Sequence, residues 1–232
     1  MGIYESLTIL DQKNLGNHIT SLNPEAGNYP ITTNPLEISV SIRSGMICWD
    51  MFSYYEHRYG ERGRRFARSD AVWLVSVSEL PEQIATEQVK WLARYLAIRG
   101  MPTYTMEVQM RLHYKLLSEK LPEYEVRYRK FLKAADELKA IRNKFIDDSL
   151  FEKSNELFAK NLDLMSLSYS SDVLPVKNTG LLIASSLADA GNNIPDAVAS
   201  LKNWLTDDSR FPAGWIDAIR KTYSDLEHKM GK

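Results

Sequence analysis

Helical periodicity is the feature that most constrains this chain. Apolar residues recur at spacings of three and four along most of its 232 residues, and the strict alternation of a half-buried β-strand is nearly absent. A chain without strand patterns must build its core by packing helices on helices. We therefore expect an all-α fold, with about eight helices in an orthogonal or antiparallel bundle and no significant sheet.

Proline and glycine mark the expected ends of the helices. Pro35 follows the capping residue Asn34, and Glu37 stands three positions after the cap, which is the pattern of a capping box. Gly60 is expected to end this first helix just after Tyr59. The same punctuation predicts further helices at about 64–80, 82–99, 102–120, 123–145, a segment through 162, and shorter helices at about 177–190, 195–206 and 213–229.

A loop-forming stretch divides the N-terminal region from the rest of the chain. Residues 23–35, "NPEAGNYPITTNP", hold three prolines and a glycine among asparagines and threonines. We expect a weak helix and loop at 1–33, a helical core at 34–162, and C-terminal helices at 163–232 packed on the same core as one domain.

Composition and termini exclude several classes of protein. A formal net charge of -1 argues against a surface built over the whole chain for nucleic acid. The single cysteine, Cys48, excludes an internal disulfide, so we expect a reducing, cytoplasmic location. The start "MGIYESLTIL" lacks the pattern of a signal peptide, and no window approaches the roughly 18 apolar residues of a membrane span. We expect a soluble protein.

The sequence lacks the familiar catalytic motifs. There is no glycine-rich phosphate loop, no H-E-x-x-H, no C-x-x-C, no G-x-S-x-G, and no E-x-x-H pair of the di-iron kind. We therefore predict no catalytic residue and no metal ligand set, we leave any cofactor unassigned, and we favour a protein that is not an enzyme.

Two histidines are candidates for a ligand site. His57 and His113 lie on expected helices among aromatic neighbours, in "YYEHRYG" and "RLHYKLL". Either ring could ligate a haem or act as a pH-responsive base. The alternative is a structural or surface role for both, because a single histidine carries no ligand spacing.

Asp70 and Trp73 form the second part of the candidate ligand site. If the helix begins near Arg64, Trp73 lies on its apolar line and Asp70 only about 40° away. A carboxylate on that face would need an arginine or histidine partner. Alternatively, the helix starts later and Ser69 or Asp70 is its N-cap.

Arginines are concentrated in "FSYYEHRYGERGRRFARSD", residues 52–70. Guanidinium groups favour bidentate contacts with carboxylates or phosphates. Arg62, Arg64 and Arg68 have no obvious local partner, so they are candidates for binding an anion or an acidic partner. Nucleic acid is disfavoured, because the stretch carries a net charge of only about +2.

Aromatic residues on the long helix are candidates for an interface. Tyr124, Tyr128 and Phe131 fall at the four and three spacings of a coiled-coil seam. Such a stripe is more often buried within the chain than shared between chains. We keep both interpretations, with self-association through this helix as the partner prediction.

Three functions from different classes follow. The first is a non-enzymatic helical regulatory or interaction module, which could sense a small ligand between helices. The second is a haem- or cofactor-binding protein or enzyme, by analogy of fold alone with haem-oxygenase-like or globin-like architectures. The third is an adaptor that binds an acidic partner through the arginine cluster.

Overall fold

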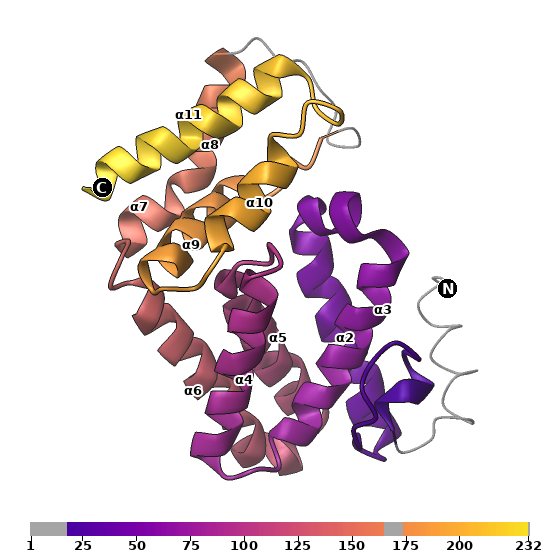
Figure 1. Ribbon diagram of the computed structural model, residues 1–232. Helices are drawn as coiled ribbons and strands as arrows, with labels where there is room; N and C mark the ends of the chain where they lie inside the picture. Colours follow the sequence, from indigo (N-terminus) through magenta and orange to yellow (C-terminus); the bar gives the residue numbers. More distant parts are fainter. Residues whose placement is uncertain (1–17, 165–173, 232) are drawn as a thin grey trace.

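The chain is almost entirely helical. The structure, a computed structural model, describes residues 18–164 and 174–231 (Figure 1). Within these ranges there are ten α-helices and no strand, only an isolated bridge between His18 and Pro30. The all-α prediction is confirmed. The helices are α2 Pro35–Met51, α3 Ser53–Val77, α4 Glu82–Ala97, α5 Thr103–Lys120, α6 Glu125–Arg142, α7 Asp148–Glu152, α8 Ser154–Leu164, α9 Thr179–Gly191, α10 Ala197–Leu205 and α11 Ala213–Lys229, with short 3-10 turns η1 Ile19–Ser21 and η2 Pro122–Tyr124.

The start of α2 confirms half of the predicted capping box. The Asn34 side chain accepts hydrogen bonds from the backbone N–H groups of Leu36, at 2.9 Å, and Glu37, at 3.4 Å. The Glu37 side chain does not return to the cap. Its carboxylate is buried, where it accepts a hydrogen bond from Tyr128 and pairs with Arg127. The Thr32 hydroxyl also donates to this carboxylate and accepts from the N–H of Asn34, so Thr32 and α6 together replace the bond that a capping box would make.

The corner after α2 differs from the prediction. α2 ends at Met51, because the backbone of Phe52 is extended, with φ -126° and ψ 96°, and its ring is fully buried in the core. α3 follows at once and bends at Gly60, which has φ 51° and ψ -148°. A residue with a Cβ rarely adopts this conformation, so glycine is needed at the bend. The predicted break at Gly60 is thus a kink within α3.

The helices form two groups that share a core. In Figure 1, α2 to α6 make up one group and α7 to α11 the other, with α9 and α10 beside the ends of α4 and α5. One hydrophobic cluster lies among α2 to α6. The other joins Trp49 and Phe52, at the α2–α3 corner, to buried residues of the C-terminal helices such as Leu182 and Trp215. The C-terminal helices therefore pack against the corner that the first group supplies.

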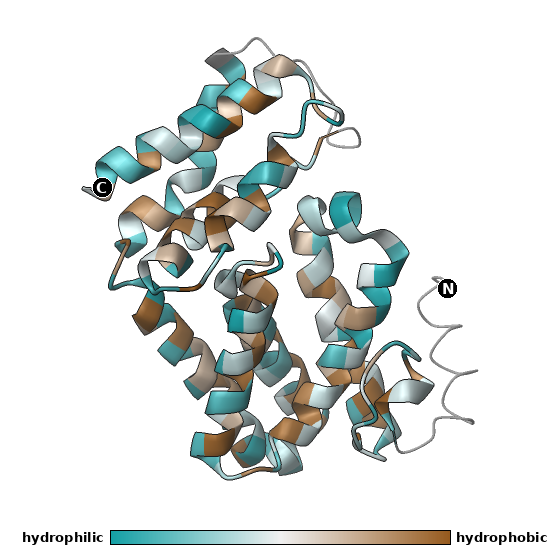
Figure 2. Cartoon of the chain, in the orientation of Figure 1, coloured by the Kyte–Doolittle hydropathy of each residue, from teal (hydrophilic) through white to brown (hydrophobic). Residues whose placement is uncertain are grey.

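Hydropathy follows this packing. Figure 2 shows hydrophobic residues gathered where helices face one another and hydrophilic residues along the outer sides. Among the helices of residues 18–164 and 174–231, none combines the length and the apolar character that a membrane span requires.

Candidate functional site

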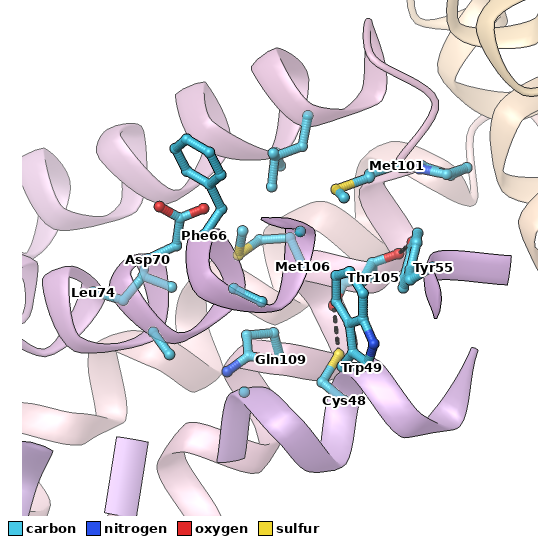
Figure 3. A pocket seen from close by; sticks show the side chains of 17 residues that line it. Cys48, Trp49, Tyr55, Phe66, Asp70, Leu74, Met101, Thr105, Met106 and Gln109 are labelled. Carbon is cyan, nitrogen blue, oxygen red and sulfur yellow. Dashed lines mark hydrogen bonds between the residues drawn. The ribbon is translucent and has the colours of Figure 1, made fainter. Parts of the chain in front are cut away.

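A cavity of about 90 Å³ lies among α2, α3, α4 and α5 (Figure 3). We call it the α2–α5 cavity. Most of its wall is apolar, as shown by one representative residue from each helix: Trp49 of α2, Phe66 of α3, Leu96 of α4 and Met106 of α5. The connection between α4 and α5 adds Met101. Such a concave, mostly apolar space between helices is the usual form of a small-ligand site.

Small residues explain why a space remains beside α3. At Gly45 of α2, an added Cβ would lie 3.0 Å from the Cβ of Ala71, so α2 and α3 approach as closely as they can. Ala67 of α3 and Ala93 of α4 line the cavity and carry only a methyl group each. The close approach on one side and the short side chains on the other leave room at the centre.

Asp70 is the one acidic residue among the side chains that line the cavity. It lies one helical turn after Phe66, and Figure 3 shows its carboxylate beside the Phe66 ring. No hydrogen bond or ion pair joins this carboxylate to any other residue of the described ranges. Burial raises its pKa from 3.8 to about 7, because the surrounding protein disfavours the charged form. Since α3 is helical on both sides of Asp70, the alternative that it caps a helix is wrong.

His113 lies close behind the cavity wall rather than on it. Its ring is fully buried, and Nε2 donates a hydrogen bond of 2.9 Å to the carbonyl of Ala71. The other nitrogen, Nδ1, lies 2.6 Å from both the Ser44 hydroxyl and the Gln109 amide nitrogen, from which it can accept. Burial lowers the pKa of His113 to about 4, so the ring is neutral. Both nitrogens are thus engaged within the protein, which favours the structural interpretation of this histidine.

The other two predicted ligand residues lie away from the cavity. His57 is exposed on the short first part of α3. Trp73 is partly buried and packs edge-on against Trp91 of α4, with 6.5 Å between ring centroids. Neither residue lines the cavity, so the structure brings together no pair among the four candidates.

The expectation that three arginines lack partners is wrong. Each of them forms an ion pair with a glutamate, from the N-terminal loop, across the bend at Gly60, or within α3 itself. The pairs are Arg62 with Glu25 at 2.7 Å, Arg64 with Glu56 at 2.7 Å, and Arg68 with Glu61 at 3.6 Å. Because these carboxylates neutralise the guanidinium groups, the cluster is a weaker surface for an anion than the sequence suggested.

The aromatic seam of the long helix is largely interior. Tyr128 and Phe131 are buried between α6 and the rest of the first group, and their rings stack 6.2 Å apart. Tyr124 is 41% exposed. Of the three predicted interface residues, only Tyr124 is on the surface, so self-association through this seam would need α6 to separate from its own core.

Most of the cavity wall was not foreseen from the sequence. Met101, Met106 and Gln109 line the cavity from α5 and the turn before it, and their helical spacing alone predicts only a buried face. Asp70 was found because a carboxylate on an apolar face breaks the pattern. A cavity formed jointly by four helices leaves no comparable signal in any one of them.

Metal chemistry and known relatives add no further assignment. Among residues 18–164 and 174–231, no group of three histidine, cysteine or acidic side chains is placed to hold a metal ion. Comparison with protein-family models, with curated proteins and with solved structures gave no significant match to this chain.

Proposed function

We propose that this chain is a non-enzymatic helical module that binds a small ligand in the α2–α5 cavity. The observation that carries the proposal is the Asp70 carboxylate, which lines a mostly apolar space without a partner in the described chain. Leaving a charged group desolvated and unpaired costs several kcal/mol. A group kept in such a place is a candidate for binding something from outside the chain.

The neighbours of Asp70 support binding rather than catalysis. Burial raises the pKa of the Cys48 thiol to about 12, so it is not an activated nucleophile. The Tyr55 hydroxyl is hydrogen-bonded to the Thr105 side chain, and burial holds its pKa well above the usual value. An acid or base working with Asp70 would have to lie within hydrogen-bond reach of it or of the ligand. The other titratable residues that line the cavity, Cys48 and Tyr55, make no hydrogen bond to Asp70.

The connection between α4 and α5 gives the proposed module a route for regulation. Met101 in this connection lines the cavity. The Ser200 hydroxyl of α10 donates a 2.6 Å hydrogen bond to the carbonyl of Ile98, and the N–H of Thr103 donates one of 2.9 Å to Asp189 of α9. A ligand that displaces Met101 would therefore act on a segment tied at both ends to the C-terminal helices.

Methionine methyl groups offer a direct test. In protein labelled with ¹³C at the methionine methyls, Met101 and Met106 report on the cavity and Met230 on a remote site. The probes are n-butanol, n-butylammonium and butyrate, which share one alkyl chain and differ in charge. We expect at least one probe to shift the two cavity methyls saturably while Met230 stays unchanged.

A blocked cavity is the matched control for that titration. Ala67→Leu places a larger side chain in the cavity and should abolish the shifts while the remaining spectrum is preserved. A shift of the Ser200 amide on binding would support the regulatory route. If none of the three probes produces a saturable shift at Met101 or Met106, the proposed function is wrong.

A further inference from the structure

We propose that the ligand of the α2–α5 cavity is a short organic cation, an alkylammonium whose charge pairs with Asp70 and whose apolar chain fills the cavity. This inference rests on the proposed function and adds the chemical class of the ligand. It is argued from the charge, the wall and the size of the cavity in turn.

The charge of the cavity favours a cation. Among the lining residues, Asp70 is the only one that carries a formal charge near neutral pH, since Cys48 and Tyr55 remain protonated. No lysine, arginine or histidine lines the cavity from α2, α3, α4 or α5. His113 behind the wall is neutral. An anion would be repelled, a neutral molecule would leave the carboxylate unpaired, and a cation would supply the missing partner.

The wall of the cavity favours an organic cation over a metal ion. Calcium and magnesium need six or more oxygen ligands or a shell of retained waters, which a single carboxylate in an apolar space does not supply. The Phe66 ring lies beside the carboxylate, and the Arg62 guanidinium already lies 5.7 Å from the centroid of that ring. The Trp49 ring, deeper in the cavity, offers an apolar surface that suits an alkyl chain.

The position of Asp70 sets the orientation of the ligand. Asp70, Phe66 and Leu96 keep part of their surface exposed, whereas Cys48 and Met106 are buried. The charged end of the ligand therefore lies at the opening, between α3 and α4, and the apolar end points toward α2 and α5.

The volume of the cavity limits the ligand. A cavity of roughly 150 Å³ holds one benzene molecule. The α2–α5 cavity, at about 90 Å³, is smaller, so it fits a short alkyl chain and not an aromatic amine. A ligand of about five non-hydrogen atoms binds at best with a micromolar Kd.

The experiment compares probes of equal length and different charge on the full chain at pH 8. Titration of the methionine methyls should give n-butylammonium a Kd at least tenfold below that of n-butanol, and butyrate should cause no shift. Asp70→Asn should raise the Kd of n-butylammonium at least tenfold and leave that of n-butanol unchanged. Because Asn removes a desolvated charge, this variant should fold at least as well as the parent.

The outcomes separate this inference from the proposed function. If n-butanol binds as tightly as n-butylammonium, or if Asp70→Asn leaves the Kd of n-butylammonium unchanged, the cavity binds small ligands but the assignment to cations is wrong. If no probe binds, the proposed function itself fails. For the cation, lowering the pH from 8 to 6 should weaken binding several-fold in the parent and leave Asp70→Asn unaffected, because protonation removes the charge of Asp70.

Discussion

Acidic side chains in two regions of this molecule have opposite surroundings. At the junction of α5, α6 and α9, Glu107 lies 3.4 Å from the Arg142 guanidinium, and Asp189 accepts hydrogen bonds from the backbone N–H and the hydroxyl of Thr103. At the α2–α5 cavity, Asp70 has no partner in the described chain. Burial raises the pKa of all three carboxyls, most clearly to about 6 for Asp189 and about 7 for Asp70.

This difference distinguishes two acids that stabilise the fold from the one that we propose binds a ligand. Donors from other helices offset the desolvation of both acids: Arg142 joins Glu107 of α5 to α6 within the first group, and Thr103 joins Asp189 of α9 to α5 across the two groups. No donor in the described chain offsets the desolvation of Asp70. The junction stabilises the fold, and the contrast supports the proposal that the cavity binds a ligand from outside the chain.

Removing one partner at the junction should have the largest effect. Arg142→Ala leaves Glu107 buried with only the more distant Arg111, 3.6 Å away, and should lower the free energy of unfolding by about 3–5 kcal/mol. Urea denaturation measures the change. Replacing both Glu107 and Arg142 by Met should cost less than Arg142→Ala alone, because no unpaired charge remains. A loss below about 1 kcal/mol for Arg142→Ala would show that the pair is not structural.

Asp189→Ala should also destabilise the protein. The variant leaves the buried N–H and hydroxyl of Thr103 at the start of α5 without their acceptor, and we expect a loss of about 2–3 kcal/mol in the same denaturation experiment. Ser209→Ala, at an exposed loop position, is the control and should be near neutral. An unchanged midpoint for Asp189→Ala would remove the contrast between the two regions.

Asp70→Asn should change stability in the opposite direction. Since the Asp70 pKa is about 7 in the folded state and 3.8 in a free carboxyl, the folded protein holds an extra proton between these pH values, so stability falls as pH rises. Linkage puts the cost above pH 7 at about 4 kcal/mol, and an unpartnered Asn amide retains part of it. We expect a gain of about 2 kcal/mol at pH 8, shrinking toward zero below about pH 4. A loss of stability at pH 8 would mean that Asp70 has a partner.

The smallest effect is expected at the arginine cluster. Arg62 and Glu25 are exposed, and surface ion pairs of this kind contribute little. Arg62→Gln should leave both the denaturation midpoint and the binding of the butyl probes unchanged. A clear change in either measurement would indicate that the arginine cluster has a functional role.

Local signals in the sequence predicted local structure well. Asn34 and Pro35 mark the start of α2, and Gly60 marks the bend in α3, because each acts through its own backbone geometry. The direction of the Glu37 side chain was not predictable, since two of its three partners, Arg127 and Tyr128, lie on α6 and only Thr32 is close in sequence. Local sequence rules determine where helices begin and bend, but they do not determine which distant residue a buried side chain will bond to.

The candidate site was predictable only in part, for the same reason. Asp70 stood out as a carboxylate on an apolar face. We expected an arginine or histidine to face it, but none of the described residues pairs with it. Gln109 and Met106 were indistinguishable from core residues, because their role depends on how far α3 and α4 stand apart. For His113 the sequence left open a ligand role and a structural or surface role, and the structure shows a neutral, hydrogen-bonded core residue.

The pKa of Asp70 tests the central claim most directly. The ¹³C resonance of its carboxyl group can be followed by NMR against pH in the ligand-free full chain, with Asp70→Asn identifying the signal. The account predicts a pKa of about 7. A value at or below the ordinary 3.8 would show that the carboxylate is solvated or paired, and would contradict the assignment of Asp70 as an unpartnered group awaiting a cationic ligand.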